Sequence, residues 1–349
     1  MKSSKKIAVI GGGIVGMHIA NSLNEAGHEV WILERENRFG HHTSSRNSGV
    51  IHAGIFYETN SLKERSCLAG NKLTYAWAIK LGIRYKKTGK LIIAKHDELC
   101  KLLKLQEKAS GLGLKNKLIY GCMDINFIQN IVGEIALFIE DTGIIDVAQY
   151  LVEMERYLTD HDVMMINNCN ICEVQGNRLI TNRGNIQFDA IINSCGLWSD
   201  DMIQQCGMDG YEIRPMRGDY AIIPYPLITM PVYGLPDEDN NVLGVHLTPT
   251  VDNQTLIGPN AYFINDKYSY KHNTDICVFI DSIKDLFYNL KINDVRYAYS
   301  GNRPKLFKDG VMIKDFQIIK HNDWIHLLGI ESPGLTSAPA LGEYVRDMI

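Results

Sequence analysis

The chain has 349 residues, about twice the usual size of a single domain, which predicts two domains with a substantial core. Hydrophobic residues make up 45% and charged residues 22%, values that exclude a disordered chain, a fibrous chain and a small disulfide-stapled module. The 36 Lys and Arg against 40 Asp and Glu give a net charge of −4, so the basic excess that attracts nucleic acid is missing and no nucleic acid partner is expected.

The first 34 residues predict a nucleotide-binding unit. A β-rich run over 7–10 leads into Gly11-Gly12-Gly13-Ile14-Val15-Gly16, a GxGxxG motif; a helical stretch follows to Ala26, and a second β-rich run over 30–33 ends at Glu34. A basic lead before an apolar stretch also begins many signal peptides. This order of strand, glycine turn, helix, strand and acid is nevertheless the dinucleotide-binding fingerprint in its required context.

The residues of this fingerprint have separate tasks. Gly11 allows the tight turn, Gly13 lets the backbone approach a pyrophosphate at the start of the helix, and Gly16 permits close packing of helix on strand. Glu34 accepts hydrogen bonds from the hydroxyls of an adenosine ribose and disfavours the 2′-phosphate of NADP. The motif by itself leaves FAD and NAD open.

Two further segments are typical of cofactor contacts. Residues 41–55 combine small and hydroxylated side chains with interspersed glycines, so the backbone can run close to a flat ligand and donate hydrogen bonds to it. Residues 329–337 form a glycine-rich turn before a helix expected from Ala338 to Asp347, with Pro339 tolerated in its first turn. Two such sites at opposite ends of the chain predict one extended cofactor.

The elements in between predict two interleaved domains. Helices are expected around 62–81 and 147–158, and strands at 90–94, 163–166, 171–174 and 189–193. Alternating strands and turns over 207–319 predict an antiparallel sheet. We expect residues 1–81, 147–206 and 320–349 to form the cofactor-binding domain, and residues 82–146 and 207–319 to form the substrate-binding domain.

A family resemblance is carried by the glycine fingerprint and seven blocks spread along the chain. The blocks are 44–55, 193–200, 217–220, 244–250, 258–261, 299–305 and 329–336. In this order they resemble the FAD-dependent D-amino-acid oxidase superfamily and, within it, the L-2-hydroxyglutarate dehydrogenase/oxidase group. The resemblance implies an α/β two-domain fold, in which a Rossmann-like FAD-binding domain of the glutathione reductase type is interleaved with an antiparallel-sheet substrate domain. The chain departs from the group's longer members in its compact stretch 262–299, which borders the substrate domain.

The resemblance also implies which residues bind FAD. It places the backbone of Ile171 beside the adenine, although this residue is equally well interpreted as part of a core strand. The turn at 299–306 contains no cysteine for flavin attachment, so FAD is expected to be non-covalent. The expected FAD-binding residues are Gly11, Gly13, Ile14, Val15, Gly16, Glu34, Arg35, Thr43, Ser44, Ser45, Ser48, Gly49, Ile171, Cys195, Gly196, Trp198, Ser332, Pro333, Gly334, Leu335 and Thr336.

Oxidation of a 2-hydroxy acid needs a group that holds the carboxylate, a base for the hydroxyl proton and a hydride acceptor. Arg303 is the first candidate to hold the carboxylate, because a planar guanidinium forms two hydrogen bonds with such a group. Arg217 either holds a second carboxylate or pairs with Asp219. Lys305 is expected to lie in solvent.

Two histidines are candidates for the catalytic base. His52 leads, because it lies in the block expected to contact the flavin and a histidine accepts a proton near neutral pH. His246 is the alternative, and for each the competing interpretation is a histidine bonded to backbone. His41 and His42 are interpreted as loop residues near the pyrophosphate.

Three functions are compatible with these residues. The favoured hypothesis is an FAD-dependent dehydrogenase or oxidase that converts a 2-hydroxy acid, above all L-2-hydroxyglutarate, to the 2-oxo acid by hydride transfer to flavin N5. Electrons then pass to a quinone, to oxygen or to another acceptor, which the sequence does not specify. The alternatives are an amino-acid or secondary-amine oxidase like glycine or sarcosine oxidase, and a catalytically degenerate flavoprotein subunit.

Cysteine usage and hydropathy bear on the compartment. Eight scattered cysteines predict free thiols in a reducing compartment, the cytoplasm. Cys169 and Cys172 form a CxxC, but no second pair stands at zinc spacing, so these are expected to be structural thiols and no metal is expected. No apolar run approaches the roughly 18 residues of a spanning helix, which excludes an integral membrane segment and leaves peripheral contact with the inner face of a membrane open.

Overall fold

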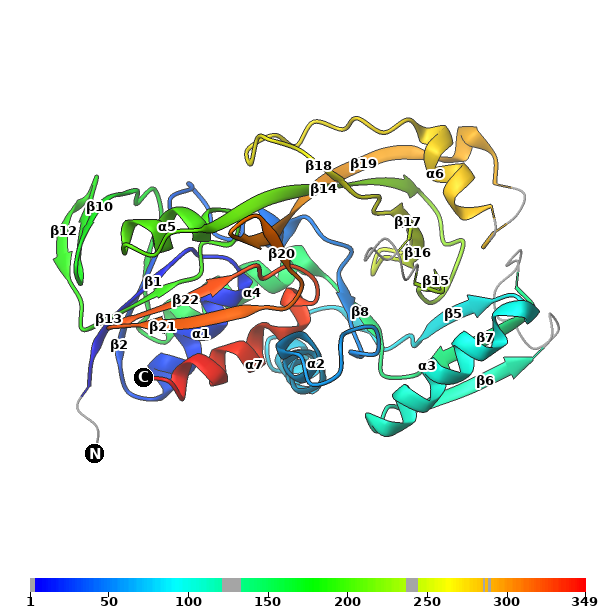
Figure 1. The fold of residues 1–349 in the computed structure, drawn as a ribbon, viewed down its shortest axis with the longest axis horizontal. Coiled ribbons are helices and arrows are strands. Elements are labelled where there is room, and N and C mark those ends of the chain that lie inside the picture. The colour runs from blue at the N-terminus through cyan, green and yellow to red at the C-terminus, as the bar shows by residue number, and fades with distance from the viewer. Residues whose placement is uncertain (1–3, 121–132, 237–243, 285, 288–289) are drawn as a thin grey trace.

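The computed structural model describes residues 4–120, 133–236, 244–284, 286–287 and 290–349. Within these ranges the chain has a mixed α/β fold built on two large sheets (Figure 1). None of the helices in the described ranges combines the length and the apolar character needed to cross a bilayer.

One sheet has six strands in the order β21-β22-β13-β1-β2-β9, all parallel except the β21/β22 pair. Every residue of its inner strands β13 and β22 is buried, as expected for parallel strands that are covered on both faces. The strands are β1 (Lys6–Ile10), β2 (Glu29–Leu33), β9 (Met164–Ile166), β13 (Ala190–Asn193), β21 (Gln317–His321) and β22 (Trp324–Leu328).

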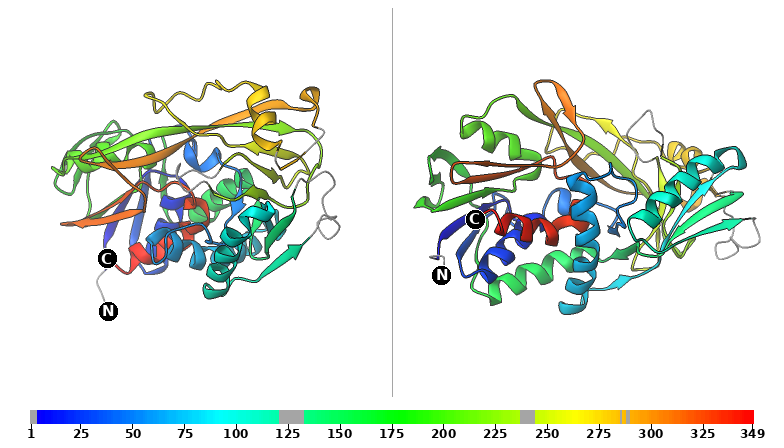
Figure 2. Two further views of the ribbon diagram at one scale, coloured as in Figure 1. Left: turned by 45° about the vertical axis from the view of Figure 1, so that its right-hand side comes forward. Right: turned by 60° about the horizontal axis from the view of Figure 1, so that its bottom comes forward.

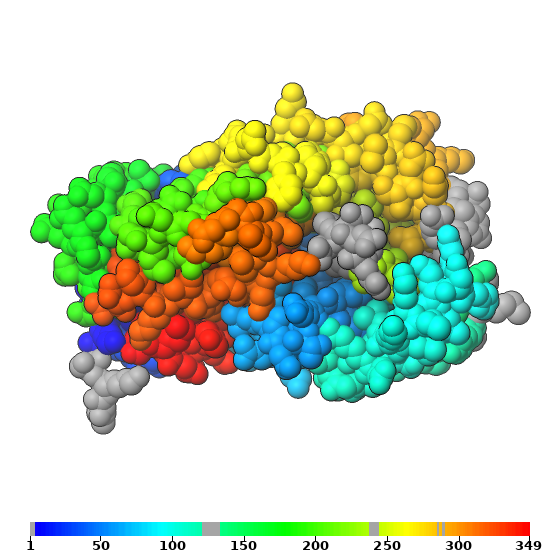
Figure 3. All heavy atoms as spheres, viewed as in Figure 1, coloured from blue at the N-terminus to red at the C-terminus, as the bar shows by residue number. Residues whose placement is uncertain are grey.

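Helices cover one face of this sheet (Figure 2). The apolar residues of α1 (Ile14–Glu25), α4 (Val147–Asp160) and α7 (Gly334–Arg346) share one core with β1 and β2. Helix α7 also packs against α2 (Leu62–Lys80), so segments from the two ends of the chain lie side by side, as the blue and red atoms in Figure 3 show.

Helix α7 corrects one prediction. It begins at Gly334, one turn before the expected start at Ala338, and Pro339 therefore lies inside the helix and not in its first turn. The missing N–H of this proline removes one helical hydrogen bond, a loss that burial of Ala338 and Leu341 in the core offsets.

The opposite face of the six-stranded sheet is covered by a small antiparallel sheet of β10 (Ile171–Gln175), β11 (Arg178–Thr181) and β12 (Gly184–Gln187), with α5 (Ser199–Gln205) beside it. Cys169 is buried in this layer and Cys172 is exposed, and both are free thiols.

The second large sheet has the order β20-β19-β14-β17-β16-β15-β5-β7-β6, with β18 paired to β14. Its strand pairs are antiparallel, except that β15 and β5 are parallel. The long strands β14 and β19 pair with each other along most of their length. The strands are β5 (Lys90–Ala94), β6 (Asn116–Tyr120), β7 (Ile135–Ile139), β14 (Tyr211–Ile223), β15 (Val232–Gly234), β16 (His246–Pro249), β17 (Thr255–Gly258), β18 (Tyr262–Phe263), β19 (Arg296–Lys308) and β20 (Val311–Ile313).

Smaller elements complete the described chain. Helices α3 (Leu99–Gly111) and α6 (Ile276–Ile283) pack on the second sheet, and β3 (Val50–Ile51), β8 (Gly143–Ile145) and β4 (Tyr85–Lys86) form a three-stranded sheet between the large ones. The predicted combination of a nucleotide-binding α/β unit and an antiparallel sheet is confirmed.

Candidate active site

A cavity of about 970 Å³ is lined by residues of both large sheets. At one end lie the glycine turn after β1 and Glu34 at the end of β2; at the other lie His52, His246 and Arg303. A cavity of this volume, lined by segments far apart in the chain, suits an extended cofactor with a small substrate beside it.

The glycine turn is shaped as the fingerprint predicts. Gly11 has φ +98, a conformation that favours glycine, and a Cβ added at Gly16 would come within 2.1 Å of the Gly11 carbonyl oxygen. Gly13 caps the start of α1 and lines the cavity. Ser44 Oγ accepts a hydrogen bond from Ile14 N at 3.0 Å, so the next cavity-lining segment reaches this helix terminus.

Glu34 lies against the same turn. Its Oε2 accepts a hydrogen bond from Gly12 N at 2.7 Å and its Oε1 accepts one from Glu36 N at 2.9 Å. Burial raises the pKa of this carboxyl, and the two backbone hydrogen bonds oppose that shift. Each carboxylate oxygen retains acceptor capacity, as hydrogen bonds from ribose hydroxyls require.

The start of α7 forms the second cofactor contact. Thr336 Oγ1 accepts a hydrogen bond from His52 N at 3.0 Å and donates one to the Val50 carbonyl at 3.3 Å, which fixes the 44–52 segment to the helix terminus. Gly334 and Leu335 line the cavity. Two helix N-termini and a glycine cradle therefore face one cavity, and this donor set fits FAD.

Most of the predicted FAD-binding residues line the cavity. Those that do are Gly11, Gly13, Ile14, Val15, Glu34, Arg35, Thr43, Ser44, Ser48, Ile171, Cys195, Gly196, Trp198, Ser332, Pro333, Gly334 and Leu335. Gly16, Ser45, Gly49 and Thr336 do not line the cavity, and Gly16 and Thr336 support the lining segments through packing and backbone hydrogen bonds.

Both candidate bases are held neutral. Burial, with Lys90 and His246 nearby, lowers the pKa of His52 to about 3, and its Nε2 lies 3.4 Å from Ser332 Oγ. Burial likewise lowers the pKa of His246 to about 4. Because His246 Nδ1 donates to the Gly244 carbonyl at 3.0 Å, its Nε2 is the nitrogen that can accept a proton.

Arg303 projects from β19 into the cavity. Its Nη1 donates one hydrogen bond, to the Asn260 carbonyl at 3.3 Å, and no acidic partner is recorded for it in the described chain. A Cβ at Gly218 would lie 3.1 Å from the same nitrogen, so this glycine makes room for the guanidinium. Most donors of Arg303 are therefore available to a carboxylate.

Arg217 has a different place from the one expected. It does not line the cavity: its Nε donates to Asn302 Oδ1 at 2.7 Å, and its two terminal nitrogens donate to the carbonyls of Ser269 and Lys271. With every nitrogen engaged by the protein, Arg217 has no role in gripping substrate in this structure.

The alternative pairing of Arg217 with Asp219 is also absent. Asp219 accepts hydrogen bonds from the hydroxyls of Ser300, Thr274 and Tyr262. Burial alone would raise the pKa of Asp219, but these hydrogen bonds bring it below its usual value.

Arg217 anchors a segment that we call the strap, residues 264–275. The strap follows β18 and returns to the cofactor side, where Lys267 pairs with Asp200 at 2.8 Å and Tyr270 bonds to His42 Nδ1 at 2.8 Å. Tyr268 packs on Trp198 with ring centroids 4.8 Å apart. The strap therefore contacts several residues that line the cavity.

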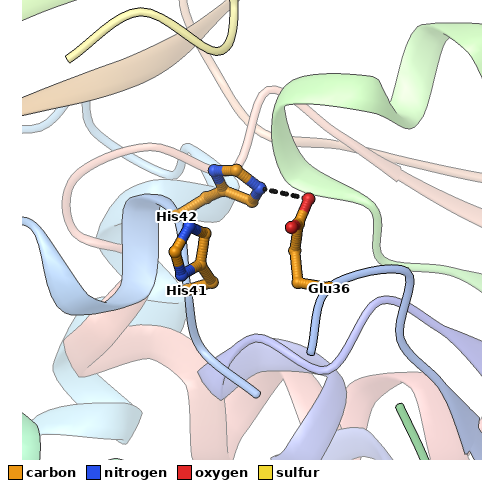
Figure 4. A group of neighbouring side chains, drawn as sticks. All are labelled: Glu36, His41 and His42. Atoms are coloured by element: carbon orange, nitrogen blue, oxygen red, sulfur yellow. Dashed lines mark hydrogen bonds and ion pairs between the residues drawn. The ribbon is translucent and has the colours of Figure 1, made fainter. Parts of the chain in front are cut away.

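Figure 4 shows Glu36, His41 and His42, whose side chains are grouped closely enough to suggest a metal site. Their atoms already have partners: His42 Nε2 bonds to Glu36 Oε1 at 3.0 Å and Arg38 Nε donates to His41 Nδ1 at 3.0 Å. Arg35 lies 3.3 Å from the same carboxylate. With two arginines beside it, the group is a hydrogen-bonded cluster and a poor cation site.

Sequence reasoning missed several cavity residues. Lys305, expected in solvent, lines the cavity and pairs with Glu331 at 2.8 Å, as Lys63 does. Tyr220 and Tyr233 also line the substrate end. The signal in the sequence is the spacing, because residues two apart in a strand such as β19 share a face, which places Lys305 on the same side as Arg303.

Comparison with known proteins identifies the class. A family model for FAD dependent oxidoreductases, DAO, matches residues 6–348, and the chain belongs to this family. It is an FAD-dependent oxidoreductase, and its cofactor is FAD.

Individual relatives carry more than one activity in their names. The L-2-hydroxyglutarate dehydrogenase of Escherichia coli K12 is 27% identical, covering 97% of this chain and 91% of its own. A glycerol 3-phosphate dehydrogenase of Caloramator mitchellensis is 29% identical over 98% of this chain and 73% of its own. The FAD-bound L-alpha-glycerophosphate oxidase of Mycoplasma pneumoniae superposes with a TM-score of 0.86 at 24% identity, covering 99% of this chain and 94% of that one, which shows a shared fold.

Proposed function

We propose that this enzyme oxidises the CH–OH group of a 2-hydroxy acid, with L-2-hydroxyglutarate as the favoured substrate. The observation that supports this most is the pairing, in one cavity, of an arginine with uncommitted donors and a neutral histidine. The 27% identical relatives named L-2-hydroxyglutarate dehydrogenase support the same substrate.

In this proposal Arg303 binds the substrate carboxylate through paired hydrogen bonds and orients the α-carbon. His52 accepts the hydroxyl proton, since burial keeps its imidazole unprotonated. Bound FAD supplies the acceptor for the hydride that leaves the same carbon. The buried rings of Tyr220 and Tyr233 line the cavity and contribute apolar surface around the substrate.

A second candidate substrate is glycerol 3-phosphate, favoured by the Caloramator relative that covers 98% of this chain. It has a CH–OH group and an anionic phosphate, so the same base and an arginine would serve it. An amine substrate would also use the arginine, but it needs no base for a hydroxyl proton.

The test is reduction of the bound flavin by added substrate under anaerobic conditions. Loss of the flavin's visible absorbance measures the reduction. L-2-hydroxyglutarate, its D-isomer, glycerol 3-phosphate, glycine, sarcosine and L-proline are added separately. We expect bleaching by L-2-hydroxyglutarate, and a loss on the order of 10²-fold in kcat/KM for Arg303→Met, which removes charge-assisted hydrogen bonds. Bleaching by glycerol 3-phosphate alone supports the second candidate, and bleaching by an amine alone refutes both.

A further inference from the structure

Lys90 is a buried cation without a recorded anionic partner. It is 1% exposed at the first position of β5, and in the described part of the chain no salt bridge or hydrogen bond of its ammonium group is recorded. Lysines are almost never this buried unless they are paired, because removing a charge from water costs several kcal/mol. Burial lowers its pKa to about 7, which leaves the charged form substantially populated at neutral pH.

The surroundings of Lys90 are the walls of the substrate end of the cavity. Its Nζ lies 4.2 Å from the ring centroid of Phe56 and 4.9 Å from that of Tyr233, and both rings line the cavity. The Tyr233 ring stacks on His246 at 4.0 Å. Aromatic faces tolerate a cation but do not neutralise it, so its field extends into the cavity.

The same wall contains a polar atom without a partner among the described residues. His246 Nε2 is buried and forms no hydrogen bond, whereas the hydroxyls of Tyr233 and Thr248 interact with each other. Buried polar groups are normally paired, and unpaired ones gather where a ligand completes the site. An unpaired cation and an unpaired imidazole nitrogen therefore lie in one wall of the cavity.

We propose that the wall formed by Phe56, Tyr233 and His246 over Lys90 is the subsite for the second anionic group of the substrate. Arg303 binds one anionic group of the substrate. Lys90 does not line the cavity, and it attracts the second anionic group through its electric field. The chemical class is a dianion that carries a CH–OH group, either a dicarboxylate or a phosphate ester. The inference rests on the proposed function and deepens it.

The charge of Lys90 gives this subsite a pH dependence. The titratable groups that face it are Cys67 on α2, His52 after β3, Tyr233 on β15 and His246 on β16. Burial raises the pKa of Cys67 and Tyr233, and it lowers the pKa of both histidines, so all four are neutral near pH 7. Attraction to a dianion is therefore strongest below the Lys90 pKa and weakens as the pH rises above it.

The test measures binding of product-like anions by the change they cause in the flavin absorbance of the intact holoenzyme. 2-Oxoglutarate is compared with 2-oxobutyrate, and dihydroxyacetone phosphate with dihydroxyacetone, so that the dicarboxylate and phosphate arms are separated. The variant is Lys90→Met, and the matched control is Lys95→Met, an exposed lysine just beyond the same strand.

Because Coulomb energy scales with charge, we expect Lys90→Met to weaken the binding of 2-oxobutyrate roughly threefold and the binding of 2-oxoglutarate roughly tenfold. Lys95→Met should change neither affinity. The melting temperature of Lys90→Met should stay the same or rise, since an apolar side chain of similar volume replaces an uncompensated buried charge. In the unmodified protein, the ratio of the two affinities should fall between pH 6 and 9, a readout that needs no variant.

Equal weakening of mono- and dianion by Lys90→Met, or an affinity ratio that does not change with pH, overturns the Lys90 subsite and leaves the proposed function intact. Failure of 2-oxoglutarate and dihydroxyacetone phosphate to perturb the flavin of the unmodified protein overturns the proposed function itself. Lys90→Arg, which keeps the charge, should restore the preference for the dianion.

Discussion

Residues of the same chemical type have different tasks in this protein because their surroundings differ. Arg217 donates to three acceptors of the protein, whereas one recorded hydrogen bond leaves Arg303 with donors to spare. Lys63 and Lys305 share Glu331, whereas Lys90 faces aromatic rings. The charged residues of the proposed site therefore differ from others of the same type in having few partners within the protein.

His52→Asn should reduce kcat by on the order of 10²- to 10⁴-fold, because a general base contributes that much to proton transfer. The unprotonated ring is the active form, and its pKa lies near 3, so kcat/KM of the unmodified enzyme should not fall as the pH decreases from 7 to 5. Rates measured across this range check the assignment. A decline centred near pH 6.5 would contradict it, and a larger loss in His246→Asn than in His52→Asn would move the role to His246.

Among the elements, the turn from β1 to α1 separates two demands on glycine. A Cβ at Gly16 meets backbone at 2.1 Å, whereas a Cβ at Gly13, a residue that lines the cavity, meets only the Ser44 hydroxyl, at 2.9 Å. One glycine therefore serves packing and the other serves the cofactor.

Gly16→Ala should lower the free energy of unfolding by about 1–3 kcal/mol or more, because the backbone cannot move aside without strain. Gly13→Ala should keep most of its stability and bind FAD more weakly. Chemical denaturation of the FAD-free proteins and titration with FAD measure the two effects. Equal loss of stability in both variants would contradict this division.

The strap makes Arg217 a structural residue. Arg217→Met leaves the Lys271 carbonyl without its donor and the Ser269 carbonyl with Asn302 Nδ2 alone, and hydrogen bonds to charged groups are worth about 1.5–3 kcal/mol each. We expect the strap to loosen and FAD to dissociate faster, seen as a rise in free-flavin fluorescence, while KM is unchanged in the FAD-saturated enzyme. Tyr270→Phe, which removes one hydroxyl, is the milder control. A raised KM with normal FAD retention would instead favour Arg217 as a substrate ligand.

At the scale of the molecule, buried neutral histidines make stability depend on pH. Burial lowers the pKa of His18 and His52 to about 3, and that of His246 and His326 to about 4. Their unfolded-state pKa is about 6.5, so the unfolded chain binds more protons below that value.

Stability should therefore be fully present above pH 6.5 and fall as the pH decreases from 6.5 toward 4, by up to about 1.4 kcal/mol per pH unit for each of these histidines. Urea unfolding at pH 7.5, 6.0 and 5.0 measures the slope, and His18→Gln, which lies outside the cavity lining, should reduce it. A free energy of unfolding that is constant from pH 7 to 5 would contradict these pKa shifts.

Local patterns predicted the parts of the site that lie within one stretch of chain. The glycine fingerprint, Glu34 and the turn at 329–336 were predictable because strand, turn and helix follow one another directly. Arg217 was misassigned because its acceptors lie more than 50 residues away. The burial of Lys90 was not predicted, because it stands at the start of an apolar strand, where a lysine is ordinarily exposed. Its burial depends on α2 and on β15, which is distant in the sequence.

The order of strands in the six-stranded sheet has a consequence for biosynthesis. Strand β1 is complete after ten residues, but its neighbour β13 is made near residue 190, and β22, next to β13, is made near residue 325. On the ribosome, β1 therefore lacks one neighbour until β13 has emerged, and β13 then keeps an open edge until β22 emerges; such edges invite pairing with other chains. We therefore expect nascent chains stalled between residues 200 and 310 to be protease-sensitive and to recruit chaperones, whereas chains that extend past α7 fold.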